Sequence, residues 1–199
     1  MPDKPDLAAL VGSRICHDLI SPIGAIGNGV ELMVMEGTSA KGPEMALISE
    51  SVGHANARIR FFRVAFGATG TDQRIDRSEV VAILADMLQG GRVAIDWTSA
   101  ADLPRRDVKL VFLLILCAES AMPYGGRITI ERGDTRWLLQ ATAPKLKIDT
   151  ALWDCLADPN AIADIGPAQV QFLLVPEEIS RQHRRLSADL SATGIKLSF

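Results

Sequence analysis

The first third of the chain contains a long run of apolar residues at helical spacing. They recur at steps of three or four positions: Leu7, Val11, Ile15, Leu19, Ile23, Ile26, Val30 and Met33. Because each helical residue turns by ~100°, these side chains fall in one narrow stripe. The pattern predicts a single long helix from about Leu7 to about Glu36, with one buried face.

A second helix is expected after a short turn. Residues 37–42 are mostly small or polar, and Pro43 follows them at a position where proline favours the start of a helix. The apolar spacing then resumes at Met45, Ile48, Val52, Ala55, Ile59, Phe62 and Phe66. This spacing is typical of antiparallel helices in a bundle. Residues 1–70 are therefore predicted to form a helical hairpin domain.

Two amphipathic helices cannot enclose a complete core between them, because each apolar stripe still needs a neighbour on its far side. Two hairpins paired in a four-helix bundle would supply that neighbour. A two-fold dimer is also the commonest symmetry of soluble oligomers. We therefore expect a homodimer.

After residue 70 the pattern changes to short alternating elements. Helices are expected at 79–88, 107–121 and 168–184, and strands at 93–97, 127–132, 137–142, 186–190 and 194–199. Helices on one face of a mixed sheet make an α/β sandwich. The predicted fold class is thus α+β, with the hairpin followed by a second domain at residues 71–199.

Composition and charge narrow the possible partners. Hydrophobic residues make up 48% of the chain and charged residues 23%, which is ordinary for a globular protein. The net charge of -3 gives no electrostatic reason to bind nucleic acid or an anionic membrane.

The longest apolar stretch, Val111 to Ala118, is far shorter than the ~18 residues of a membrane span, and the first ten residues do not resemble a signal peptide. A cytoplasmic protein is expected. The three cysteines fit neither a disulfide framework nor a zinc site.

The candidate chemistry lies on the first helix. His17 falls ~200° from the apolar stripe and should point outward. The candidate partner-binding residues around it are Ser13, Arg14, Ser21, Gly24, Asn28 and Glu31. A neutral imidazole is a good nucleophile, and Asp18 could orient it or accept its proton if rotamers allow contact. His54 and His183 have no comparable polar surroundings and are expected to be structural or surface residues.

The segment from His17 to Pro22, HDLISP, resembles the phosphoacceptor box of sensor histidine kinases. The wider stretch ICHDLISPIGAIGNGVELM is similar to the ChpT-type histidine phosphotransferases of alphaproteobacterial cell-cycle signalling. This resemblance implies a hairpin dimer that carries the phosphorylated histidine, followed by a degenerate histidine-kinase-like (GHKL) ATPase domain. It implies catalytic roles for His17 and Asp18.

The kinase resemblance also implies that nucleotide chemistry is lost. Cys117 stands where kinases have a magnesium-binding Asn, and a thiol is a poor ligand for Mg²⁺. Ala141 to Pro144 replaces the adenine-recognising Asp and its glycines, and only Gly166-Pro167 remains of the Gly-rich lid. We expect no ATP binding, no metal site and no cofactor of the protein's own.

The function implied is a histidine phosphotransferase that relays a phosphoryl group between the receiver Asp of a hybrid histidine kinase and the receiver Asp of response regulators. The receiver would bring the Mg²⁺, so this chain needs only an accessible histidine. One alternative is a noncatalytic, pseudokinase-like dimer that binds receivers without carrying phosphate. A second is an autophosphorylating kinase with a divergent pocket, which Cys117 and the Ala143 region argue against.

Overall fold

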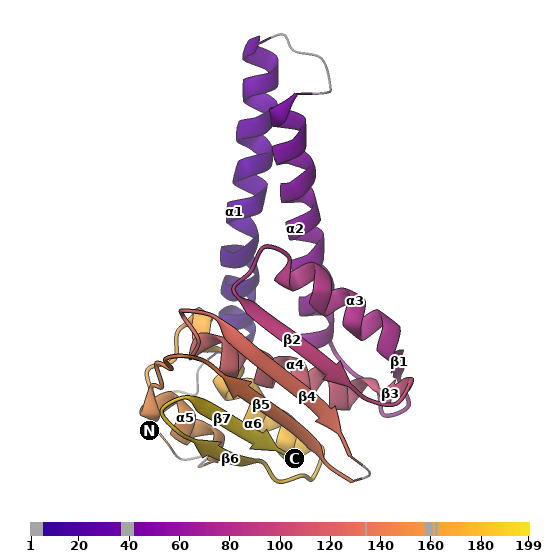
Figure 1. Ribbon diagram of the computed structural model, residues 1–199, viewed down its shortest axis with the longest axis vertical. Helices are drawn as coiled ribbons and strands as arrows, with labels where there is room; N and C mark the ends of the chain where they lie inside the picture. The colour runs from indigo at the N-terminus through magenta and orange to yellow at the C-terminus, as the bar shows by residue number, and fades with distance from the viewer. Residues whose placement is uncertain (1–5, 37–41, 134, 158–160, 162) are drawn as a thin grey trace.

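A helical stalk stands on an α/β unit in the computed structural model (Figure 1). Residues 6–36, 42–133, 135–157, 161 and 163–199 are described. The stalk consists of α1 (Leu7–Glu36) and α2 (Pro43–Ala65), which run side by side. The two helices agree with the predicted hairpin, whereas residues 37–41 of the predicted turn lie outside the described residues. The predicted α+β class is confirmed.

The two stalk helices pack closely at Gly29, which is buried. A Cβ atom at this position would lie 2.7 Å from Cγ1 of Ile48 on α2, so the small residue permits the contact. The predicted buried stripe is only partly covered within one chain, because six of its eight members are half-buried and Ile23 and Val30 are exposed. The exposed fractions are 58% for Ile23 and 48% for Val30. Two helices leave these positions without a neighbour.

The second unit is a sheet covered on one face by helices. Its helices are α3 (Arg77–Leu88), α4 (Arg105–Ser120), α5 (Thr150–Ala157) and α6 (Gln171–Arg181), with a 3-10 turn at Pro167–Gln169. Five strands form the main sheet in the order β2-β4-β5-β7-β6: β2 (Val93–Thr98), β4 (Gly126–Arg132), β5 (Trp137–Thr142), β7 (Gly194–Ser198) and β6 (Ser187–Leu190). Only the β2–β4 pair of this sheet is parallel. The short strands β1 (Arg74–Asp76) and β3 (Asp102–Pro104) pair separately.

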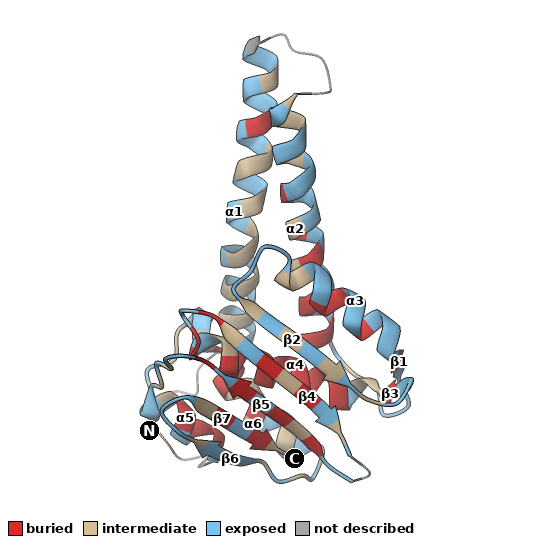
Figure 2. Ribbon diagram, in the orientation of Figure 1, coloured by how far each residue is buried: buried red, intermediate tan, exposed pale blue. Residues whose placement is uncertain are grey.

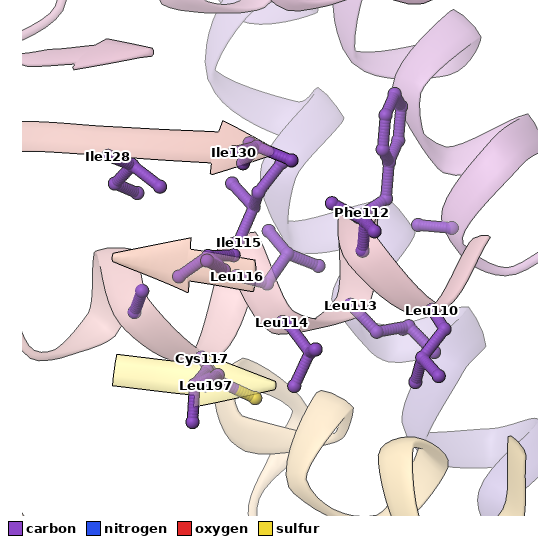
Figure 3. Packing of buried hydrophobic residues seen from close by; sticks show 14 of the residues in the cluster. Leu110, Phe112, Leu113, Leu114, Ile115, Leu116, Cys117, Ile128, Ile130 and Leu197 are labelled. Atoms are coloured by element: carbon purple, nitrogen blue, oxygen red, sulfur yellow. The ribbon is translucent and has the colours of Figure 1, made fainter. Parts of the chain in front are cut away.

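The core of the second unit is built around α4, which is buried continuously from Asp107 to Ala118. Figure 3 shows its side chains packed against those of the sheet, among them Ile128, Ile130 and Leu197. A helix with apolar residues on all sides is expected to lie inside a domain. The predicted α/β sandwich is therefore confirmed.

Some elements differ from the sequence prediction. The helix predicted at 168–184 begins as a 3-10 turn, and α6 ends at Arg181, two residues before the left-handed backbone of His183 at φ 53°. Three further elements, α5, β1 and β3, were not predicted from the sequence. These elements are eight residues or shorter, which leaves little periodicity to detect.

Side-chain hydrogen bonds attach the second unit to the end of the stalk. The guanidinium group of Arg105 donates to the carbonyl oxygen of Arg63 at 2.9 Å. The ammonium group of Lys109 donates to the carbonyl oxygen of Gly67, also at 2.9 Å. The apolar core also continues into α2 through Phe61 and Phe62. Within the described part of the chain, no helix is both long and apolar enough to span a bilayer.

Candidate functional site

His17 lies on the outward side of α1, with 83% of its side chain exposed. The predicted outward orientation is therefore confirmed. Five of the six candidate partner-binding residues are exposed as well: Ser13, Ser21, Gly24, Asn28 and Glu31. A Cβ atom built on Gly24 would meet nothing within 4 Å, so the surface there is open. The imidazole is thus accessible along a face of small and polar residues.

The Asp18 carboxylate contacts the imidazole of His17. The Nδ1 atom of His17 lies 3.1 Å from Oδ1 of Asp18, and only 9% of the Asp18 side chain is exposed. An ionised carboxylate can only accept a hydrogen bond, so this contact requires the proton to be on Nδ1. A neutral imidazole with that proton has its lone pair on Nε2, as a nucleophile requires. The sequence had left this contact dependent on rotamers.

Two arginines hold the other oxygen of the same carboxylate. Nε of Arg14 donates to Oδ2 of Asp18 at 2.8 Å from one helical turn earlier, and Nη1 of Arg58 on α2 donates to it at 3.3 Å. Arg14 differs from the rest of the predicted partner-binding set, because its side chain is 15% exposed and already engaged. Its spacing of four residues from Asp18 was a readable signal for the pair. Arg58 was missed, since it lies 40 residues from Asp18 in sequence.

A polar cleft of about 650 Å³ lies beside this group, between the stalk and the second unit. Its lining includes Asp18, Arg58, His54 and Glu119, the last from the end of α4. Burial raises the pKa of Glu119; the nearby Arg58 and Arg14 guanidinium groups lower it, and Asp18 raises it further. The cleft therefore joins the side of α1 that carries Asp18 to the second unit. His54 is half-buried there, and His183 is exposed elsewhere.

The second unit places its kinase-like positions in the core. Cys117 has no exposed surface, and burial raises the pKa of its thiol well above the usual range (Figure 3). Ala143 is also buried. The Gly125-Gly126 turn has a backbone role, because Gly125 has φ 84° and a Cβ atom there would lie 2.3 Å from the Arg92 carbonyl oxygen. Within the described residues, no three His, Cys, Asp or Glu side chains are arranged to hold a metal ion.

Comparison with known proteins gives consistent matches. Residues 77–194 match the family model of the histidine phosphotransferase C-terminal domain. The chain is 40% identical over 134 residues to the protein phosphotransferase ChpT of Brucella abortus (strain 2308). The aligned residues make up 65% of this chain and 63% of that protein. The chain thus spans less than two thirds of this relative. It also matches the solved structure of a bacterial phosphotransferase with a TM-score of 0.81 and 31% identity, over 100% of this chain and 97% of that one.

Proposed function

This chain belongs to the histidine phosphotransferase family, and on that premise we propose that it relays a phosphoryl group through His17 between the aspartates of partner receiver domains. The donor would be the receiver of a hybrid histidine kinase, and the acceptors would be response regulators. The observation that carries the proposal is the exposed imidazole whose Nδ1 atom is bound by Asp18. This geometry supports the proposed catalytic roles of His17 and Asp18.

In the proposed reaction, Nε2 of His17 attacks the phosphorus of the receiver's aspartyl phosphate. The N–P bond forms, the P–O bond to the aspartate breaks, and the receiver's carboxylate leaves. The proton stays on Nδ1, so the phosphorylated ring carries a positive charge that the Asp18 carboxylate offsets. In the reverse direction the same charged ring is a good leaving group from phosphorus. Mg²⁺ bound by the receiver would neutralise the charge on the phosphoryl group.

We further propose that receivers dock along the exposed face formed by Ser13, Ser21, Gly24, Asn28 and Glu31. Small and polar side chains let a partner helix approach α1 closely. A stable protein interface buries ~800 Å² on each partner, so docking would extend beyond α1. Arg14 would contribute to the transfer step rather than to docking, through Asp18, which it binds directly.

We also propose that the hairpin at residues 1–70 forms a homodimer through a second exposed face. This face carries large apolar residues on α1: Ile20, Ile23, Val30 and Val34. On the helical wheel it lies next to the docking face but does not coincide with it. A four-helix bundle made by two copies would cover these side chains and leave His17 accessible.

The second unit, residues 71–199, is proposed to act without ATP, metal or another cofactor of its own. The burial of Cys117 supports this, because a thiol without exposed surface cannot reach a metal ion bound to nucleotide. The unit would then serve the hairpin as a scaffold.

The proposed function is tested by incubating the chain with a receiver labelled with ³²P at its Asp, in the presence of Mg²⁺. We expect acid-labile label to move to this chain and, after addition of a second receiver, to leave it. Complex formation without any labelled chain would instead support the noncatalytic receiver-binding dimer. Labelling by Mg²⁺-ATP alone would support the kinase alternative.

A further inference from the structure

The carboxylate of Asp18 is held at a point where three parts of the chain meet. Arg14 reaches it along α1, and Arg58 reaches it from α2. Arg14 also donates from Nη1 to the carbonyl oxygen of Ala168 at 2.6 Å, in the 3-10 turn of the second unit. One guanidinium group therefore bonds the residue beside His17 and the backbone of a segment 154 positions away.

The positions of the two arginines leave Asp18 little freedom. Both bind Oδ2, so Oδ1 is the oxygen that faces Nδ1 of His17. Charge-assisted hydrogen bonds of this kind are about twice as strong as neutral ones, and they hold the Asp18 carboxylate, which is only 9% exposed, in one orientation. An imidazole without such a partner would exchange its proton between both nitrogens.

We propose that Arg58 and Arg14 are positioning residues for phosphoryl transfer, and that the second unit holds them in place. In this arrangement His17 keeps its proton on Nδ1 and presents Nε2 to the receiver. This inference rests on the proposed function of His17. It assigns the second unit a part in transfer that needs no nucleotide. The unit holds Arg14 through the Ala168 carbonyl and forms the wall of the cleft that Arg58 and Glu119 line.

Glu119 is consistent with this arrangement. An ionised carboxylate at its position would compete with Asp18 for Arg58. Burial raises the pKa of Glu119 and so reduces that competition. Arg58 is then left to bind Asp18.

The test uses the full chain with Arg58→Gln, Arg58→Lys and Arg14→Lys. Glutamine removes the charge at position 58, while lysine keeps it. Lysine at position 14 also keeps the charge, but as a point charge it cannot reproduce the fork that bonds Asp18 and Ala168 together. Arg60→Gln is the matched control, because Arg60 lies on the same helix and pairs with Asp86 at 2.6 Å without contacting Asp18.

Two quantities are measured. The ¹⁵N chemical shifts of the His17 ring report the tautomer without any receiver, and single-turnover transfer from a labelled receiver gives the rate and the apparent affinity. For Arg58→Gln and Arg14→Lys we expect a mixture of His17 tautomers. The transfer rate should fall about tenfold, in proportion to the fraction of His17 rings that carry the proton on Nδ1, and the affinity for the receiver should not change. Arg58→Lys should restore most of the rate, and Arg60→Gln should match wild type.

The inference is overturned if folded Arg58→Gln and Arg14→Lys chains keep the Nδ1–H tautomer and the wild-type rate. It is also overturned if the rates fall while the tautomer does not change. A wild-type chain that accepts no label refutes the proposed function instead, and the ¹⁵N measurement separates the two failures because it needs no transfer.

Discussion

The stalk and the second unit differ in how much of their apolar surface they cover themselves. Figure 2 shows buried residues concentrated in α4 and the sheet, whereas the far part of the stalk is largely exposed or half-buried. The exposed fraction is 77% for Val34 near the end of α1. In α4, by contrast, even the charged residues Asp107 and Lys109 are buried.

This difference in covered apolar surface indicates which substitutions each part of the molecule can tolerate. A self-contained core keeps its fold as long as apolar volume is preserved, so a kinase-like ATP site can be lost from it without loss of structure. Cys117 fits such a core as a small apolar residue. The stalk instead carries His17 on exposed surface and leaves apolar residues such as Val34 uncovered within one chain. The comparison predicts that substitutions in the stalk change transfer and assembly, and that substitutions in the second unit change stability.

The largest effect is expected for His17→Ala, which removes the nucleophile from an exposed position. Transfer from a labelled receiver should fall below detection, while the thermal unfolding midpoint should stay at the wild-type value because His17 packs against little. His183→Ala is the control, since His183 is an exposed histidine of the second unit. Label that persists on the His17→Ala chain would show that another residue accepts the phosphoryl group.

Gly24→Arg should slow transfer by at least about tenfold, because a large charged side chain would occupy the proposed docking surface. The fold should not suffer. Space around Gly24 is open, and replacing a helical glycine adds up to about 1 kcal/mol of helix propensity. Gly24→Ala controls for that propensity without adding bulk. Normal transfer by folded Gly24→Arg would place the docking surface elsewhere.

Ile23→Asp is expected to separate the dimer, because it would bury a charge in the four-helix bundle. Light scattering should then give the mass of one chain, 21.5 kDa, rather than twice that value. Ser49→Asp adds a charge at an exposed polar position of α2 and should leave the dimer intact. A wild-type chain that is already monomeric would contradict the proposed bundle.

The sequence predicted well what depends on local periodicity. The run from Leu7 to Met33 located α1, and the same run placed His17 on the outward side. The apolar segment around Val111 located α4 in the core. These features follow from the side-chain pattern within one element, which short sequence windows contain.

Contacts between distant segments could not be predicted in this way. Arg58 meets Asp18 only because α2 packs against α1, and Arg14 meets Ala168 only because the 3-10 turn of the second unit folds back onto the stalk. The exposure of Ile23 likewise depends on how α1 and α2 pack, and not on the spacing of residues within α1. The sequence therefore pointed to His17 and Asp18, which lie in contact, but not to the arginines that bind Asp18.

Cys117→Asn tests the second unit directly, because it introduces the residue that the kinase resemblance associates with magnesium. Cys117 has no exposed surface, so asparagine there would bury a polar amide group with neither the space nor the water it needs for hydrogen bonds. The free energy of unfolding should therefore fall by about 1–3 kcal/mol. Cys117→Ala controls for loss of the sulfur. Urea unfolding measures the change, and calorimetry with Mg²⁺-ATP should show no binding to wild type or to either variant. Micromolar binding would mean that the ATP site is partly retained.

The smallest effect is expected at the junction of the two regions, for Glu119→Gln. Burial raises the pKa of Glu119 in the folded chain above its value in the unfolded chain, despite the opposing Arg58 and Arg14. Below the ordinary Glu pKa of about 4.3 both states bind the proton, so no stability is lost. As the pH rises through the window between the two pKa values, the unfolded state loses its proton first, and folding becomes less favourable.

Glutamine does not titrate, so Glu119→Gln should remove this loss of stability. Above the ordinary Glu pKa of about 4.3, the variant should therefore gain stability relative to wild type, and the difference should grow until the pH passes the raised pKa of the folded chain, as urea unfolding at each pH would measure. Glu131→Gln on the exposed side of β4 controls for the loss of one charge. A difference between Glu119→Gln and wild type that is constant across this range would mean that the Glu119 proton contributes nothing to the junction.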